Sequence, residues 1–191
     1  MLILASSSPF RRDLLERLGI PFQCIKPEID ESRQNNESLQ QQVTRLSSAK
    51  ARKIASTSSS PALIIGSDQL ASCGGEVFAK PGNHERASEQ LRKMAGQTLT
   101  FKTGLCLLNT STGLEQLDCV DYRVHFRNFS EEEIQRYLHA EKPFNCAGSF
   151  KSEQLGISLV ESMEGSDPSA LIGLPLIRLA TMLRKEGLNI P

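Results

Sequence analysis

The residues of this chain that could do chemistry are carboxylates and cations spread over its first 80 positions. Asp68 and Gln69 follow an apolar run, Lys50 and Lys80 lie before and after them, and residues 28–31 form an acidic connection. Carboxylates hold a hard divalent ion and orient water, while lysine and arginine neutralise phosphate charge as it develops. This combination suits hydrolysis of a nucleotide phosphate, although by spacing alone each residue also has a structural explanation.

The N-terminal segment predicts a place where an anion could bind. A short apolar run is followed by a serine-rich turn and a helix with Ser8 at the N-cap, Pro9 in the first helical position and Gly19 at the stop. The helix N-terminus is positive, so Arg11 and Arg12 in the first turn oppose the dipole. A bound polyanion would remove that conflict, but two solvated arginines on a surface helix are equally compatible with the pattern.

Lys50 and Asp68 each allow two interpretations. In the helical pattern of residues 35–56, Leu39, Val43 and Leu46 form an apolar stripe that continues onto Lys50. This lysine either extends past the core edge to solvent, which the pattern alone favours, or points into a cleft that holds an anion. Asp68 is either a residue of a turn at a strand end, where aspartate is common, or a carboxylate delivered to a site.

The remaining pattern mixes helix-linked strands with one long hairpin, so we expect an α/β fold with a mixed sheet. A capping box formed by Ser130 and Glu133 predicts one helix start, and Pro168 and Pro175 predict two more. We expect helices within residues 6–20, 35–56, 83–96, 130–140 and 167–187, and strands within 2–5, 58–72, 77–81, 97–109, 114–126 and 157–162.

Composition limits the classes of protein that fit. The length of 191 residues suits one domain over residues 1–191, and 22 basic against 22 acidic residues leave no charge that would attract nucleic acid or an anionic membrane. The first apolar run is too short for a signal peptide or a membrane span, so we expect a cytoplasmic protein. Five scattered cysteines and three histidines show neither a disulfide framework nor metal-ligand spacing.

Phosphate loops, dinucleotide fingerprints, nucleophile elbows and zinc-protease motifs are all missing from the sequence. However, "LILASSSPFRRDLL" resembles the start of the Maf family of nucleoside triphosphate pyrophosphatases. The resemblance continues through "PEIDE", "AKA", "IIGSDQ", "KP", "AGSFKSE" and "EGSDPSALIGLPL", and so spans essentially the whole chain. It implies a Maf/ITPase-like fold, in which helices flank a long mixed sheet with a central nucleotide-binding cleft.

Within that family, "SPFRR", "GSDQ" and "GSFKSE" resemble the branch that hydrolyses 7-methyl-GTP. The discriminating positions are Phe10, Gln69 and Glu153, where the branch acting on dTTP and UTP carries arginine, threonine and glutamine. Methylation at N7 makes guanine cationic, so Phe10 could stack on the ring, with a cation–π contribution of about 0.5 to 2 kcal/mol, and Glu153 could accept from its N–H edge. An arginine in place of Phe10 would repel that base.

The resemblance also implies a role for each site residue. Asp68 would be the general base, and Glu31 with Asp68 would bind a divalent metal cation, Mg²⁺ or Mn²⁺. Attack on the α-phosphorus would release diphosphate and 7-methyl-GMP, and the enzyme would be a homodimer. The triphosphate would be held by Ser8, Arg11, Lys50 and Lys80.

One segment departs from the family pattern. Where members of the dTTP/UTP branch often read "DKAGAY", this chain reads "NCAGSF", with Asn145 and Cys146. Two interpretations are open: a catalytic contribution of that aspartate and lysine is absent here, or the change simply marks the branch. Two alternative functions stay open from the sequence: a dTTP/UTP pyrophosphatase and a nucleotide-binding inhibitor of septation.

Overall fold

The computed structural model describes residues 1–190, which divide into two compact units. The first unit contains Met1–Gln69, Lys102–Val120 and the chain from Asp167 onward, and the second contains Leu70–Phe101 and Asp121–Ser166. Each unit is thus built from segments that are distant in sequence. The single domain expected over residues 1–191 stays a prediction.

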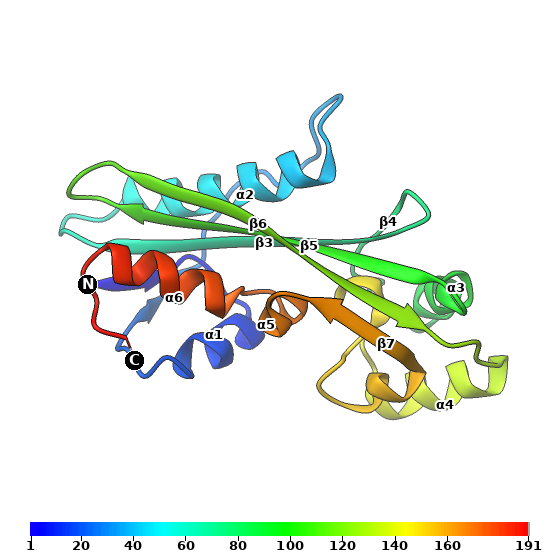
Figure 1. The fold of residues 1–191 in the computed structure, drawn as a ribbon. Coiled ribbons are helices and arrows are strands. Elements are labelled where there is room, and N and C mark those ends of the chain that lie inside the picture. Colours follow the sequence, from blue (N-terminus) through cyan, green and yellow to red (C-terminus); the bar gives the residue numbers. More distant parts are fainter. Residues whose placement is uncertain (191) are drawn as a thin grey trace. The chain divides into compact units, whose positions relative to one another are not determined.

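The strands of the described residues form a seven-stranded mixed sheet in the order β2-β1-β3-β5-β6-β7, with β4 paired to β3 (Figure 1). Strand β1 pairs in parallel with β2 and β3, whereas the pairs β3–β4 and β6–β7 are antiparallel. The predicted α/β class with a mixed sheet flanked by helices is confirmed. The strands are β1 (Leu2–Leu4), β2 (Gln23–Cys24), β3 (Leu63–Cys73), β4 (Glu76–Phe78), β5 (Thr98–Asn109), β6 (Glu115–Phe126) and β7 (Val160–Gly165).

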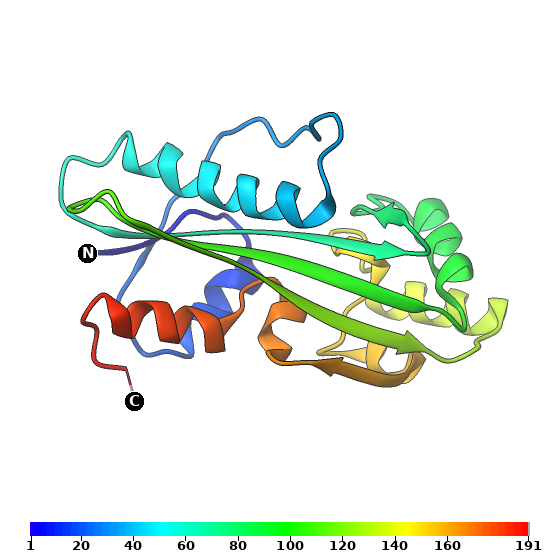
Figure 2. The same ribbon diagram turned by 45° about the horizontal axis from the view of Figure 1, so that its top comes forward.

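In the first unit, helices cover both faces of the sheet, which explains why its strands read as continuous apolar runs. Helix α2 (Leu39–Ala55) lies on the opposite side of the strands from α1 (Pro9–Glu16) and α6 (Leu176–Lys185), as Figure 2 shows. Alternate residues of β1 enter different cores: Leu2 and Leu4 pack with α1 and α6, whereas Ile3 packs with α2. Because the period of a strand is two, β1 and β3 fix both helix layers at once.

The predicted start of α1 is confirmed by its cap, and α2 also begins at a serine cap. The Ser8 side chain accepts a hydrogen bond from the Arg11 backbone N–H, and Pro9 occupies the first helical position. In α2 the Ser38 hydroxyl accepts from the N–H of Gln41, whose side chain in turn accepts from the Ser38 N–H. Such reciprocal caps satisfy N–H groups that a helix start leaves without partners.

The second unit contains α3 (His84–Met94), which packs on α4 (Glu131–Glu141), and the 3₁₀ helices η1 (Ala147–Ser149) and η2 (Leu155–Leu159). The predicted capping box of α4 is present: the Ser130 hydroxyl accepts from the Glu133 N–H, and the Glu133 carboxylate accepts from the Ser130 N–H. This unit therefore starts its helices with the same devices as the first one.

Two predicted boundaries are wrong. The strand expected over residues 157–162 begins only at Val160, because the N–H of Ile157 bonds to the Gln154 carbonyl and so forms a helical turn. Pro175 is the N-cap of α6 and not its first helical residue, whereas Pro168 does open α5 (Pro168–Ile172). The first error arises from a local hydrogen bond that competes with the pattern of apolar residues, and the second is a shift of one position at the helix start.

The described chain also shows how its thiols are placed. All five cysteines are free, and burial raises the pKa of Cys106 to about 12 and that of Cys146 to about 11.

Among residues 1–190, no helix combines the length and the apolar character needed to cross a membrane.

Candidate active site

Asp68 lies inside a strand and not at its end. Strand β3 runs from Leu63 to Cys73, so the interpretation of Asp68 as a turn residue is wrong. Pairing with β1 ends where Leu4 faces Ile65, and the chain then turns into the serine-rich segment. Residues 66–69 of β3 therefore continue past the carboxyl end of β1, the kind of position where open α/β sheets bind ligands.

The alternation of β3 directs neighbouring side chains to opposite faces. Asp68 contacts Lys50 of α2, whereas Ser67 and Gln69 contact the segment that contains α5. Between the strand and α2, Gly66 lies so close to the Ser47 carbonyl that no side chain would fit. This close approach brings Lys50, one helical turn after Ser47, over the carboxylate.

Two carboxylates converge on the ammonium group of Lys50. Its Nζ is 2.6 Å from Asp68 Oδ1 and 2.9 Å from Glu31 Oε1. The Lys50 and Asp68 side chains are only 7% and 10% exposed, whereas Glu31 is 57% exposed. The interpretation that the pattern alone favoured, a lysine that extends past the core edge to solvent, is therefore wrong. The buried charge of Lys50 is balanced by ion pairs, as a buried charge requires.

This arrangement fits a small divalent cation. Glu31 and Asp68 already approach one cationic atom from two sides, and carboxylate oxygens are the ligands that Mg²⁺ prefers. Within residues 1–190 no cluster of three or more acidic, cysteine or histidine side chains could hold a metal ion. The chain thus offers two carboxylates here, and water and phosphate oxygens would complete the coordination, as is common for Mg²⁺.

Arg11 and Ser8 border the same part of the first unit. Arg11 Nε donates a hydrogen bond to the Gly173 carbonyl at 2.8 Å. Burial lowers the pKa of Arg11, and the charges of Asp68 and Glu31 oppose this effect. The guanidinium thus lies within the field of both carboxylates, while Ser8 caps the helix that carries it.

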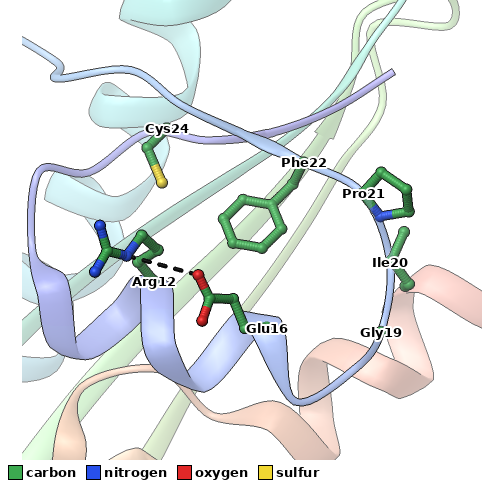
Figure 3. Close-up of a pocket in the computed structure, with 7 residues that line it drawn as sticks. All are labelled: Arg12, Glu16, Gly19, Ile20, Pro21, Phe22 and Cys24. Carbon is green, nitrogen blue, oxygen red and sulfur yellow. Dashed lines mark ion pairs between the residues drawn. The ribbon is translucent and has the colours of Figure 1, made fainter.

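Arg12 points elsewhere. It forms exposed ion pairs with Asp13 and Glu16 on its own helix. Figure 3 shows Arg12 and Glu16 at an open hollow of about 530 Å³ beside the rings of Pro21 and Phe22. This hollow contains none of the predicted site residues. Arg12 therefore lines the hollow, whereas Arg11 contacts the Gly173 carbonyl.

Gln69 and Phe10 also belong to the first unit. The Gln69 amide nitrogen donates toward Thr103 Oγ1 at 3.1 Å and toward the carbonyls of Ala170 at 2.7 Å and Leu171 at 3.1 Å. Phe10 is half-buried in the first turn of α1. Their predicted part in base selection stays a prediction.

Lys80 and Glu153 lie in the second unit and are both exposed. Their charges shift the pKa of Cys146 in opposite directions: Lys80 lowers it and Glu153 raises it, while burial has the largest effect. Lys151 contributes more than either of them and also lowers this pKa. The two predicted binding residues therefore share one neighbourhood, which includes the cysteine of the unusual "NCAGSF" segment.

The sequence interpretation missed several polar residues that support the site. Ser67 and Thr103 are fully buried in strands, and Asp167 is 2% exposed. In the sequence, Ser67 and Thr103 are visible only as small polar residues within apolar segments, and Asp167 only as an aspartate before a proline. No pattern in the sequence indicates that these residues all contact one short helix.

Comparison with known proteins decides the family. A model of the Maf family, described as "Maf-like protein", matches residues 1–186. This chain belongs to the Maf family. The suspected resemblance is thus confirmed over nearly the full length.

Curated Maf relatives are similar along their whole length. A protein of Pseudomonas savastanoi pv. phaseolicola named 7-methyl-GTP pyrophosphatase is 54% identical over 190 residues, which cover 100% of this chain and 98% of the relative. Proteins of the same name from Pseudomonas aeruginosa and Nitrosococcus oceani are 52% and 49% identical, with 98% and 93% of their lengths covered. A solved nucleoside-triphosphatase (dITP/XTP pyrophosphatase) from Mycobacterium abscessus aligns with 67% of this chain and 75% of its own, at 14% identity and a TM-score of 0.40.

Proposed function

We propose that this Maf-family chain hydrolyses 7-methyl-GTP to 7-methyl-GMP and diphosphate. The convergence of Glu31 and Asp68 on Lys50, within the field of Arg11, carries the proposal. Relatives of that name, 49–54% identical over nearly all of the chain, support the choice of substrate. The proposal includes a single domain, a homodimer and no nucleic-acid partner. The proposal also includes a cytoplasmic location, because the substrate would come from the nucleotide pool.

Asp68 is the general base of the proposed reaction. Lys50 bonds to its Oδ1, which leaves Oδ2 to accept a proton from water. The water oxygen then bonds to the α-phosphorus, the bond from that phosphorus to the bridging oxygen breaks, and diphosphate leaves with the electron pair. Because Asp68 is held by a buried ion pair, little reorganisation is needed before proton transfer.

The cations of the site bind and neutralise the triphosphate. Ser8 and Arg11 lie at the N-terminus of α1, where a helix favours anions, and Lys50 and Lys80 add charge. A divalent cation, Mg²⁺ or Mn²⁺, held by Glu31 and Asp68 would supply Lewis acidity and neutralise charge on the phosphates.

Base selection follows from the charge of 7-methylguanine. Phe10 offers a ring face to the cationic base, with a cation–π gain of about 0.5 to 2 kcal/mol, and Glu153 supplies a negative group. Gln69 completes the set through its side-chain amide. A neutral guanine gains less from both Phe10 and Glu153, so the site discriminates by charge as well as by shape.

A substrate panel tests the proposal. Purified protein with MgCl₂ or MnCl₂ is assayed against 7-methyl-GTP, GTP, dTTP and UTP, with diphosphate and orthophosphate measured separately. We expect the highest kcat/KM for 7-methyl-GTP and diphosphate as its product. Equal or faster turnover of dTTP and UTP would overturn the substrate assignment in favour of the pyrimidine branch.

A further inference from the structure

The C-terminal end of α5 is held by side chains. An α-helix leaves its last carbonyls without backbone partners, and α5 is only one turn long, ending at Gly173 with a left-handed φ of 116°. The carbonyls of Ala170, Leu171 and Gly173 accept side-chain hydrogen bonds from α1, β3 and β5, and that of Ala170 also accepts from the Gly173 N–H. All partners belong to the first unit.

The Gly173 carbonyl joins Ser67 to Arg11. It accepts from Arg11 Nε at 2.8 Å and lies 3.0 Å from Ser67 Oγ, whose single proton it shares with the Gly104 carbonyl at 2.8 Å. Ser67 has 0% exposure, so no water can replace its hydroxyl without a rearrangement. The position of Gly173, and with it the direction of the guanidinium, depends on this serine.

Thr103 has the corresponding relation to Gln69. Its buried hydroxyl donates to the Ala170 carbonyl at 2.9 Å, so its oxygen can only accept from the Gln69 amide. Carbonyls on Ala170 and Leu171 are acceptors only, which requires the Gln69 nitrogen to face them. Gln69 Oε1 must then face away from α5, and it is the acceptor this residue can offer a base.

Asp167 keeps the other end of α5 in place. Its Oδ1 accepts from the backbone N–H and the hydroxyl of Ser169, and its Oδ2 accepts from the N–H of Ile177 in α6. One buried carboxylate therefore fixes α5 relative to the first turn of α6. With both ends held, α5 can define positions for the side chains that bond to it.

We propose that Ser67 and Thr103 are positioning residues that act through α5, Ser67 on the Arg11 guanidinium and Thr103 on the Gln69 amide. This explains how the segment "SDPSALIGLPL", far from Asp68 in sequence, contributes to the site without touching the reacting atoms. The inference rests on the proposed function, since Arg11 and Gln69 are assigned there to phosphate and base.

Double-mutant cycles on nucleotide binding test the proposal. Two ligands are used, the α,β-methylene analogues of 7-methyl-GTP and of GTP, which both resist cleavage. Each is titrated calorimetrically with magnesium present. S67A is combined with R11A, and T103V with Q69A. We expect S67A to weaken binding of the 7-methyl analogue about fivefold in the wild type but less than about twofold in R11A, as coupled residues require.

For the second pair the measured quantity is the ratio of dissociation constants for the GTP and 7-methyl-GTP analogues. T103V should lower this ratio about threefold in the wild type and leave it unchanged in Q69A. T103S keeps the hydroxyl and should restore the ratio, a rescue that depends on the hydrogen bond and not on packing. If T103V does not fold, as judged by circular dichroism, T103A replaces it in the cycle.

Ser88 supplies the matched control. It is a serine with 3% exposure in α3 of the second unit, and its hydroxyl accepts from the Gln135 side-chain amide. S88A should lower the melting temperature as S67A does but leave both affinities unchanged. Additive effects in either cycle would overturn the proposal. A wild-type protein that prefers another nucleotide refutes only the proposed function, because the cycles can be repeated with the methylene analogue of that nucleotide.

Discussion

The two groups of predicted site residues differ in what holds them. In the first unit, Lys50 and Asp68 are buried and paired, and Arg11 is tied to a backbone carbonyl. In the second unit, Lys80 and Glu153 are exposed, and within residues 1–190 neither forms an ion pair. The predicted site residues of the first unit are therefore fixed by the protein in advance, whereas Lys80 and Glu153 are exposed and are held by fewer contacts; Glu153 accepts one hydrogen bond, from Ser152 Oγ at 3.2 Å.

The exposed position of Glu153 is nevertheless defined by its backbone. Glu141, only 6% exposed at its side chain, pairs with Lys151 at 2.8 Å and accepts from the Leu155 N–H at 3.1 Å. These two contacts bracket Glu153 on both sides in sequence. This unit thus fixes the backbone around Glu153 and leaves the carboxylate exposed, with one hydrogen bond from Ser152 Oγ.

The largest effect is expected for the general base. D68N should reduce kcat for 7-methyl-GTP by about 10²- to 10⁴-fold, because the amide cannot take a proton from water. Steady-state kinetics measures this, with D13N on the exposed face of α1 as the control that should match wild type. More than a tenth of wild-type kcat remaining in D68N would remove Asp68 from that role.

Removal of Lys50 should cost stability as well as activity. K50M leaves Asp68 and Glu31 facing each other without a cation, so the free energy of unfolding should fall by about 3 kcal/mol in urea titrations. Added MgCl₂ should recover more stability in K50M than in wild type, because the cation can then take the place of the ammonium group. The control is K53M, an exposed residue in the last turn of α2. Equal responses of K50M and wild type to magnesium would contradict the shared cation site.

A smaller effect is expected for Glu153, whose carboxylate is exposed. E153Q should lower the preference for 7-methyl-GTP over GTP by about tenfold at most, since the exposed carboxylate acts on the base charge through a partly hydrated contact. Its melting temperature should equal that of wild type. E85Q, an exposed residue in the first turn of α3, is the control. A destabilised E153Q, or an unchanged preference, would refute the contrast between the two units.

The smallest effect concerns thiol chemistry beside Lys80 and Glu153. Burial raises the pKa of Cys146 to about 11, so only about one thiol in a thousand is ionised at pH 8 and alkylation by iodoacetamide should be slow. Cys24 is exposed and should react first, although burial also raises its pKa. Peptide mass mapping after short reaction times gives the order, and modification of Cys146 before Cys24 would be the contrary result.

Much of the fold could be predicted from local chemistry. Ser8 before Pro9 and the Ser130–Glu133 box mark helix starts through contacts that span three residues, which a single sequence records directly. The stripe that places Lys50 on a buried helix face is equally local. Such features depend on neighbours along the chain, and the structure confirmed them.

The partners of the site residues could not be predicted from the sequence because they depend on contacts between distant segments. Lys50 was placed on a stripe, but its ion pair depends on the close approach of α2 at Gly66. Gln69 bonds to Ala170, 101 residues away, and no spacing rule connects them. The start of β7 was missed because a 3₁₀ turn at Ile157 competes with an apolar run that fits either structure.

The most direct test of the account is to hydrolyse 7-methyl-GTP in ¹⁸O-labelled water and locate the label by mass spectrometry. Attack on the α-phosphorus by a water that Asp68 activates predicts one labelled oxygen in 7-methyl-GMP and none in diphosphate. Label in orthophosphate together with 7-methyl-GDP would show attack at the γ-phosphorus and contradict the proposed reaction.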